Sequence, residues 1–263
     1  MTPSPGHSIA PVLVRVLEED SSLGHTLSGE DLRAARRYAV ASAHTLERGI
    51  YRPQALFAGD GLLGLLVLDG LMVRQVAVAE RRCGELVSQG ALLRPWDHFG
   101  EHAPMPFEVR WRVIETARIA LLDQRFVAVV TRWPSLVYSL VERSIERAHM
   151  LAFNVAIHCL HHVDVRLLVL MWHLADRFGK VTPEGTVVPV ALTHRDLAEL
   201  VGAQRPSVSL ALGELEQREQ LKRRKDRSWV LLGDPPRELR DVQRRPARQR
   251  QHATDRPRGP LRP

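Results

Sequence analysis

Apolar positions follow helical spacing in two short, adjacent segments near residue 200. Thr193 opens the first segment with a capping-box pattern, and the apolar positions that follow share one face. Gly202 is typical of a helix end, and Pro206 stands in the first turn of the second segment, where a proline favours helix initiation. We therefore predict short helices over 194–201 and 205–217, joined by a tight turn.

The second of these helices separates its apolar and polar positions. Four apolar residues at i, i+3, i+4 and i+7 are expected to face inward: Val208, Ala211, Leu212 and Leu215. The positions left exposed near the N-terminus are Arg205, Ser207, Ser209 and Leu210. An arginine can donate two hydrogen bonds to guanine, and serine hydroxyls suit phosphates or base edges. This end therefore has the side chains expected of a recognition helix in the major groove, although an ordinary helical hairpin would show the same apolar pattern.

The segments on both sides of the helix pair favour the DNA-binding interpretation. Residues 181–192 read as a hairpin with its turn at 183–185, and residues 221–232 read as strand, turn and strand. The second hairpin carries a basic group suited to phosphate contacts, namely Lys222, Arg223, Arg224, Lys225 and Arg227. A helix-turn-helix flanked by such hairpins is a winged helix, so we predict that the chain binds DNA.

A long amphipathic segment precedes this domain. Pro134 opens a helix expected to run to about residue 161, which would span about 40 Å. Its apolar or small residues alternate at three- and four-residue spacing in a nearly heptad seam: Leu136, Val137, Leu140, Val141, Ser144, Ala148, Leu151, Val155 and His158. A partner helix would bury this seam, which predicts a parallel homodimer. The alternative is that the helix packs lengthwise against its own N-terminal domain.

Histidines and a cysteine gather near the end of the same helix. His158 and His162 are four residues apart and could bind a metal with Cys159 or a partner residue, with His161 beside them. The favoured interpretation is a polar helix end, because imidazoles are favourable near the negative C-terminus of a helix. We therefore predict no metal and no other cofactor.

In the N-terminal half the spacing of apolar residues changes from helical to strand-like. A capping-box entry at Ser28 predicts a short helix over 28–39. Short apolar runs then alternate with turns, of which Asp69-Gly70 and 59–61 are expected to be hairpin corners. The runs are 51–57, 62–68, 71–79, 85–87, 111–115 and 118–122. They predict an antiparallel jelly roll or β-barrel, and hence an α+β chain.

Length and composition fit two ordinary domains with tails. The 263 residues are 44% apolar, without the long apolar run of a membrane span or a signal-peptide pattern, so the protein is expected to be cytoplasmic. Two cysteines are too few for a disulfide framework or a four-cysteine metal site. Much of the net charge of +7 lies beyond residue 233, where nine arginines accompany four acidic residues. This tail is expected to be disordered, as a DNA-contacting arm or a solubilising extension.

The C-terminal part resembles a known family. Residues 164–232, with their linker helix, small hairpin, "Leu-Thr-x-x-x-Leu-Ala-x-Leu-Val-Gly" helix, recognition helix and wing, are similar to the C-terminal domain of Crp/Fnr bacterial transcription regulators. Under this resemblance Arg205 occupies the position of a base-reading arginine. The implied DNA contacts are Thr193, His194, Gln204, Arg205, Pro206, Ser207, Ser209, Leu210, Lys222, Arg223, Arg224, Lys225 and Arg227. The implied partners are double-stranded DNA, a second copy of the chain, RNA polymerase and a small-molecule effector not identified by the sequence.

This sequence departs from the family pattern at several positions. Pro206 stands where many members carry a base-reading Glu and Leu210 where some carry a second Arg, so the best-known operator of the family is not expected. Glu219 and Arg227 occupy positions where relatives often use glycine, and each could cost about 1 kcal/mol if φ must be positive.

The resemblance also implies a cyclic-nucleotide-binding-like β-roll in the N-terminal half. Nucleotide-binding members hold the cyclic phosphate with a short Gly-Glu-containing helix and an Arg. Here the segment after Gly90 is rebuilt, so binding of cyclic AMP in the usual way is not expected. Fragments that could hold another ligand, or that could be surface contacts, are Arg94, Trp96, Gly100 and Glu101.

The combined prediction is a homodimeric, sequence-specific transcription regulator and not an enzyme. The alternative is a cupin-like protein that binds a metal or small molecule in its β-roll, with an accessory winged helix. His44, His98 and His102 do not show a ligand spacing typical of a cupin. The predicted divisions are a flexible N-terminus (1–27), a sensor-like β-roll (28–133), a dimerisation helix (134–163), the winged helix (164–233) and a disordered basic tail (234–263).

Overall fold

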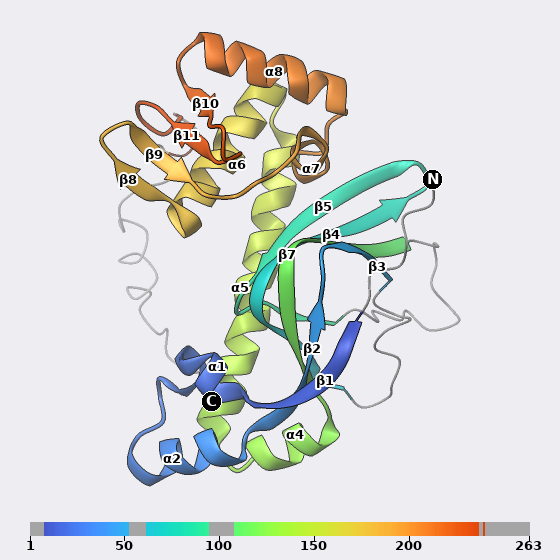
Figure 1. Ribbon diagram of the computed structural model, residues 1–263, viewed down its shortest axis with the longest axis vertical. Coiled ribbons are helices and arrows are strands. Elements are labelled where there is room, and N and C mark those ends of the chain that lie inside the picture. The colour runs from blue at the N-terminus through green and yellow to red at the C-terminus, as the bar shows by residue number, and fades with distance from the viewer. Residues whose placement is uncertain (1–7, 53–61, 95–107, 237–238, 240–263) are drawn as a thin grey trace, which may run out of the picture.

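The computed structural model describes residues 8–52, 62–94, 108–236 and 239, and it has two domains joined by a long helix (Figure 1). An antiparallel sheet with short helices at one end forms the N-terminal domain. Helix α5 (Pro134–Cys159) runs from that end to the C-terminal domain, which contains a helix-turn-helix. The α+β architecture predicted from the sequence is therefore confirmed.

The N-terminal sheet is antiparallel throughout and has the strand order β1-β2-β7-β4-β5, with β3 on β7 and β6 on β4. Its strands are β1 (Ser8–Arg15), β2 (Val40–Leu46), β3 (Gly49–Tyr51), β4 (Gly64–Val78), β5 (Arg81–Ser88), β6 (Leu92–Leu93) and β7 (Glu108–Leu122). Its core packs around Trp111 and Ile119, both fully buried. The predicted β-roll is thus a curved sheet that approaches the C-terminal domain through β4, β5 and β7 (Figure 1).

Two of these strands are longer than the sequence predicted. β4 and β7 have 15 residues each and pair along most of their length, whereas the apolar pattern predicted two short runs in place of each strand. The prediction of a hairpin corner at Asp69-Gly70 was wrong, because the register of β4 against β7 shifts there and the chain continues as a bulged strand. Gly70 has φ +92, and a Cβ at this position would lie 2.4 Å from the carbonyl oxygen of Thr116, so only glycine fits the bulge.

Short helices close the far end of the sheet: α1 (Val16–Glu19), the 3-10 turn η1 (Ser21–Gly24), α2 (Gly29–Tyr38) and α4 (Gln124–Val130). The prediction of α2 is confirmed, although the side chain of Ser28 makes no capping hydrogen bond. The prediction of a flexible segment up to residue 27 was wrong for residues 8–24, since β1 pairs with β2, and Val16, Leu17 and Leu23 are buried in this end of the core. Such contacts between remote segments leave no periodic signal in a short stretch of sequence.

Helix α5 packs against both domains. Leu136 and Leu140 are buried in the N-terminal core, and Ile157 is buried in the C-terminal core. Two residues of the predicted dimer seam, Leu136 and Leu140, therefore pack within their own chain, so for the first turns of α5 the alternative of packing on the N-terminal domain is correct. No helix in the described parts of the chain is long and apolar enough to cross a membrane.

The C-terminal domain begins with α6 (Val163–Phe178), whose apolar face is buried from Leu167 to Ala175. The elements that follow are β8 (Lys180–Thr182), β9 (Gly185–Val188), α7 (His194–Leu200), α8 (Arg205–Gln217), β10 (Leu221–Arg223) and β11 (Trp229–Leu231). The four strands form one sheet in the order β10-β11-β9-β8. The predicted helices and both hairpins are confirmed, and Figure 1 shows α8 at the end of the molecule farthest from α4.

Candidate nucleic-acid interface

Local interactions fix the entry to the helix pair. The backbone N–H of Asp196 donates to the hydroxyl oxygen of Thr193 at 3.2 Å, and the N–H of Thr193 donates to the Asp196 carboxylate at 2.7 Å, which completes the predicted capping box. Gly202 has φ +62 in the turn after α7. Pro206 lies in the first turn of α8, as its position in the sequence predicted. The sequence therefore specifies both the end of α7 and the start of α8.

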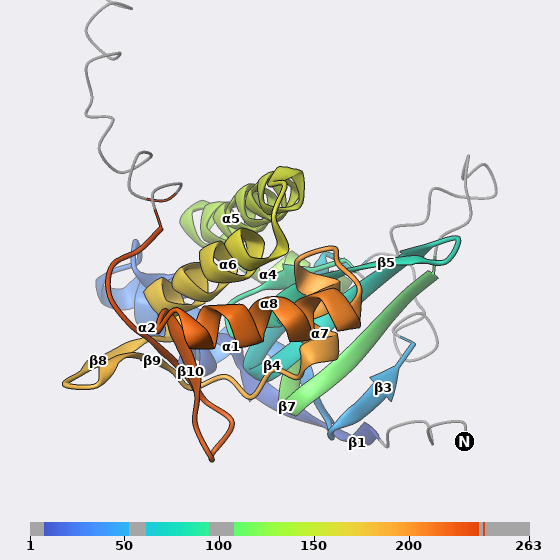
Figure 2. The same cartoon turned by 90° about the horizontal axis from the view of Figure 1, so that it is seen from above.

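Helix α8 presents a polar N-terminal face to solvent. Val208, Ala211, Leu212 and Leu215 are buried in the C-terminal core as predicted. On the other face Gln204, Arg205, Pro206, Ser207, Ser209 and Leu210 are all exposed, and Leu210 exposes 67% of its surface. Figure 2 looks down on this end of the molecule and shows α8 running across it. No element in the described part of the chain covers this face.

A side-chain contact joins the start of α7 to α8. His194 Nδ1 lies 2.9 Å from the hydroxyl oxygen of Ser209. Burial lowers the pKa of His194, and the positive charges of Arg223 and Arg205 lower it further. His194 therefore lies within the electrostatic influence of an arginine from α8 and an arginine from the wing. The structure brings these three predicted contact residues, from three elements, to one surface.

The wing is the hairpin of β10 and β11, and its turn projects from the domain (Figure 2). Lys222, Arg224, Lys225 and Arg227 are exposed, while the guanidinium of Arg223 lies 5.2 Å from the centre of the Trp229 ring. Arg224 also pairs with Glu184 at 3.4 Å. Four of the wing's five basic side chains thus remain open to solvent beyond the end of α8.

Two residues near the wing adopt the backbone conformation that the sequence comparison anticipated. Glu219 follows α8 with φ 53, and Arg227 lies in the wing turn with φ 71. Both values fall in the left-handed region, where a residue with a side chain costs about 1 to 2 kcal/mol. The interpretation that these are positions suited to glycine is therefore confirmed.

The opposite side of α7 is occupied by a buried ionic contact with the N-terminal sheet. Arg112 of β7 pairs with Asp196 and, at 3.5 Å, with Glu199, and the side-chain amide of Gln75 on β4 donates to Glu199. Both acidic side chains expose less than a tenth of their surface. Sequence reasoning missed this contact, because nothing in the spacing links a residue of β7 to one that lies more than eighty positions later.

The exposed face of α5 differs from the predicted dimer seam. Tyr138, Val141, Ile145, Ala148, Ala152, Val155 and Cys159 are all exposed and follow one another at alternating spacings of three and four. We call this set the α5 stripe. Val141, Ala148 and Val155 belong to both sets, and Ser144 is also exposed, whereas Val137 and Leu151 are half-buried. The exposed positions of α5 are therefore shifted by about one position from those of the predicted seam, away from the chain's own core.

The end of α5 contacts the helix-turn-helix of its own chain. His158 Nε2 lies 2.9 Å from the carbonyl oxygen of Leu200, so this nitrogen carries the proton and donates. The other nitrogen, Nδ1, lies 3.8 Å from the Cys83 sulfur. Among the described residues, no group of three or more His, Cys, Asp or Glu side chains could hold a metal. His158 thus helps to hold α7 against α5.

The predicted ligand residues fall partly outside the described ranges. Trp96, Gly100 and Glu101 belong to residues 95–107, as do His98 and His102 of the cupin alternative. Arg94 donates to the carbonyl oxygen of Leu62 at 3.3 Å and lines a pocket of about 290 Å³ between the sheet and α5. His44 lies in β2, and burial lowers its pKa. Among the described residues, no cluster of ligating side chains supports the cupin-like alternative.

Comparison with known proteins agrees with this geometry. Residues 165–237 match the model of the Crp-like helix-turn-helix domain. A mutant of CooA from Carboxydothermus hydrogenoformans has a similar structure, with 18% identity over 76% of this chain and 86% of that chain and a TM-score of 0.59. The regulator CLP of Xanthomonas campestris shares 18% identity over 74% and 95% of the two chains, with a TM-score of 0.54. FixK2 of Bradyrhizobium japonicum shares 13% over 77% and 96%, with a TM-score of 0.53. No curated protein sequence matches the chain.

Proposed function

Since the chain carries a Crp-like helix-turn-helix domain and has the fold of Crp/Fnr regulators, we propose that it is a sequence-specific transcription regulator that binds DNA as a homodimer. The observation that carries the proposal is the uncovered N-terminal face of α8, on which Arg205, Ser207 and Ser209 point to solvent. In a winged helix this end of the recognition helix enters the major groove.

The distribution of charge supports a division of labour at the interface. Arg205 at the start of α8 would read a base, because a guanidinium can bond to both guanine O6 and N7. His194, Lys222, Arg224, Lys225 and Arg227 would contact phosphates on both sides of that groove and set the register, as would Thr193, Gln204 and Arg223. Pro206 has no N–H to donate, and Leu210 is apolar, so their contacts would be with thymine methyl groups or sugars.

The α5 stripe supports the homodimer. Seven exposed positions in a heptad pattern extend along most of a 26-residue helix, and a second copy of the same helix would cover them with the same spacing. A twofold axis along α5 would place two α8 helices on one side of the dimer. Such a dimer reads half-sites separated by about one turn of DNA.

The N-terminal domain is proposed as the regulatory part, with an effector other than cyclic AMP. CLP is described as responsive to c-di-GMP, which is a property of that protein. In this chain the pocket beside Arg94 lies between the sheet and α5, and its lining is mainly aliphatic. Because its proposed target is chromosomal DNA and its proposed partner on DNA is RNA polymerase, the protein is expected to act in the cytoplasm and not as an enzyme.

Selection from random duplex DNA tests the proposal. The full chain would be mixed with a random library, without ligand and with cyclic nucleotides, and the bound duplexes would be sequenced. We expect an inverted repeat in the ligand-free arm, with half-sites about 10 base pairs apart. Enrichment of no motif in any arm would contradict sequence-specific recognition. Arg205→Ala serves as the matched variant, since it should broaden one position of each half-site.

A further inference from the structure

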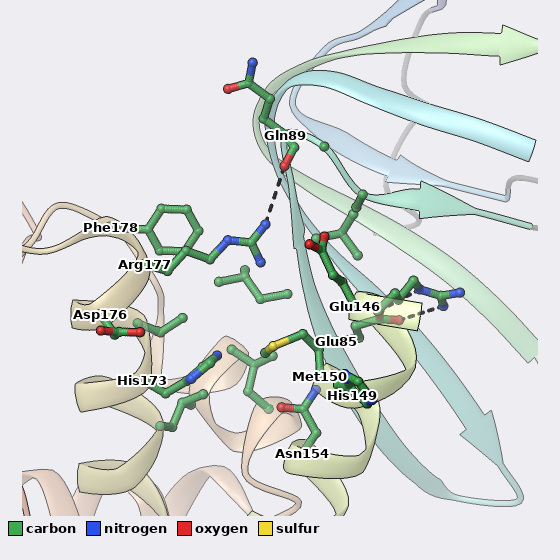
Figure 3. A pocket seen from close by; sticks show the side chains of 18 of the residues that line it. Glu85, Gln89, Glu146, His149, Met150, Asn154, His173, Asp176, Arg177 and Phe178 are labelled. Carbon is green, nitrogen blue, oxygen red and sulfur yellow. Dashed lines mark hydrogen bonds and ion pairs between the residues drawn. The ribbon is translucent and has the colours of Figure 1, made fainter. Parts of the chain in front are cut away.

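A pocket of about 490 Å³ lies where the two domains meet α5 (Figure 3). One wall is the end of β5 and the turn after it, from Glu85 to Ala91. The second wall is the middle of α5, and the third is the face of α6 that carries Leu170, His173 and Arg177 in the C-terminal domain. A volume of this size holds an organic molecule of ordinary metabolite dimensions. The pocket beside Arg94 shares Arg147 with it but is lined by no residue of the C-terminal domain.

The interior of this pocket is mainly apolar. Leu86, Met150, Leu170 and Leu174 contribute its aliphatic surface, and Figure 3 shows the side chain of Met150 pointing into the space from α5. His173 adds a polar group, and burial lowers its pKa, with the Arg177 charge acting in the same direction. The imidazole is therefore neutral near pH 7 and can either donate or accept a hydrogen bond. These groups suit the uncharged body of a ligand.

The arginines that line the pocket differ in how they are paired. Arg147 binds both carboxylate oxygens of Glu85, at 2.8 and 3.0 Å. Arg143 pairs with Asp20 at 3.2 Å and also contacts the Ser22 hydroxyl. These two guanidinium groups are therefore engaged with groups of the protein, and they shape the wall rather than offer free donors.

Arg177 is the exception. It extends from α6 across the pocket mouth to the carbonyl oxygen of Gln89, at a long 3.4 Å (Figure 3). Within the described residues it forms no ion pair with a carboxylate, and its other contact is with the Phe178 ring, 5.3 Å away. Burial lowers the pKa of Arg177, and Glu146 offsets this only in part. The Arg177 side chain as a whole is exposed, so its remaining N–H donors are open to solvent at the pocket mouth and available to a ligand there.

We infer that this pocket binds an organic monoanion, with a carboxylate on Arg177 and an apolar body against Met150, Leu170 and Leu174. A planar guanidinium binds a carboxylate through two parallel hydrogen bonds, which a lone carbonyl oxygen does not satisfy. Because the pocket walls come from both domains, an occupant would also fix the angle between β5 and α6. Any effect of this angle on DNA binding rests on the proposed function.

Calorimetric titration of the full chain with octanoate tests the site, with 1-octanol as the uncharged analogue. We expect saturable binding of octanoate to the wild-type chain. Arg177→Gln should weaken octanoate binding about 10- to 100-fold, since hydrogen bonds to charged groups are lost, while any binding of 1-octanol should not change. Arg125→Gln is the matched control, because Arg125 is exposed on α4, remote from the pocket, and loses the same charge.

A second variant controls for misfolding of the chain or displacement of the Arg177 side chain. Met150→Trp fills the pocket without changing its charge and should abolish binding of both probes, while the far-ultraviolet circular dichroism stays that of the wild type. The site is disproved if octanoate fails to saturate the wild-type chain at millimolar concentration. It is equally disproved if Arg177→Gln and Arg125→Gln bind octanoate alike.

The link to DNA is tested separately. Anisotropy of a labelled duplex carrying the selected motif would be measured with and without octanoate, and the DNA affinity should change in the wild type but not in Arg177→Gln. Failure of the chain to select any DNA sequence would contradict the proposed function and leave the calorimetric result unaffected. Binding of octanoate with unchanged DNA affinity would overturn the coupling between pocket and α8.

Discussion

The two sides of the helix-turn-helix use charge in opposite ways. On the outer side Arg205, Lys222 and Lys225 are exposed. On the inner side Asp196 and Glu199 are nearly buried and held by Arg112 and Gln75 of the N-terminal sheet. An exposed charge costs little in folding and remains available to a partner, whereas a buried one must be compensated within the chain. The outer side therefore suits binding of an anion, and the inner side suits holding one domain against the other.

This comparison also shows why acidic residues lie on α7 at all. Asp196 serves twice, as the N3 residue of the capping box and as a partner of Arg112. A negative charge is favourable in the first turn of a helix, and here the same charge orients α7 against β7. The position of the recognition surface therefore depends on a residue of the N-terminal sheet.

Removal of Arg112 should have the largest effect. Arg112→Ala leaves two carboxylates in a buried site without their main cation, which should cost about 3 to 5 kcal/mol. Urea unfolding followed by tryptophan fluorescence would measure the loss. Arg118→Ala is the comparison, because Arg118 pairs with Glu19 at a partly exposed site and should cost at most about 1 kcal/mol. Equal losses in the two variants would mean that the buried contact of Arg112 stabilises the fold no more than the partly exposed pair of Arg118 does.

A charge in the α5 stripe should have the next largest effect. Ile145 exposes 49% of its surface in one chain and would be covered in a dimer. Ile145→Asp should raise the dimer dissociation constant about 100-fold, because the carboxylate would be buried opposite an apolar face. Sedimentation velocity would show a monomer, while Ile145→Leu should remain dimeric. A dimer unaffected by the aspartate would refute the assignment of the stripe.

Loss of Arg205 tests the outer side directly. Arg205→Ala should weaken binding to the selected sequence by about 1 to 3 kcal/mol and relax the preference at one base position. Competition between the selected duplex and variants at each position would measure both effects. If cognate and random DNA are weakened equally, Arg205 contacts the backbone and does not read a base.

Loss of Lys222 should produce a smaller and different change. Lys222 is exposed on β10, so Lys222→Ala should weaken binding to all sequences to a similar extent. The slope of log affinity against log salt should fall in magnitude by roughly one unit. A change in the selected motif would instead assign Lys222 to base recognition.

Lowering the pH should have the smallest effect on DNA affinity. Burial and then Arg223 and Arg205 lower the pKa of His194, so the folded protein favours the neutral form and this part of its stability is lost as pH falls below about 6.5. Bound phosphates would favour the charged form, so DNA affinity should rise modestly between pH 7.5 and 6. His194→Gln should flatten that dependence. An identical pH profile in both proteins would remove His194 from the interface.

Elements specified by neighbouring residues could be predicted from the sequence, while contacts between distant residues could not. Thr193, Gly202 and Pro206 act on the chain next to them, and the helix boundaries they indicate agree with the structure. The bulge at Gly70 resembles a hairpin corner in sequence, since a glycine with positive φ serves both, and only the pairing with β7 distinguishes them.

The same limit explains why the exposed α5 stripe differs from the predicted dimer seam. Leu136 and Leu140 have the spacing of a coiled coil, but both are buried in the N-terminal core, in the same cluster as Val130 and Phe126. An amphipathic helix with two apolar faces does not reveal which face its own domain covers. The interdomain contact of Arg112 gives no periodic signal at all.

The conformation of Arg227 implies a trade-off between folding and binding. A non-glycine residue with φ 71 makes the wing turn less stable than glycine would by about 1 kcal/mol, yet the turn gains a cation at its tip. Replacement by glycine should therefore yield a domain that melts at a higher temperature and holds DNA less firmly. In the wing the protein would therefore be less stable than it could be, and it would bind DNA more tightly.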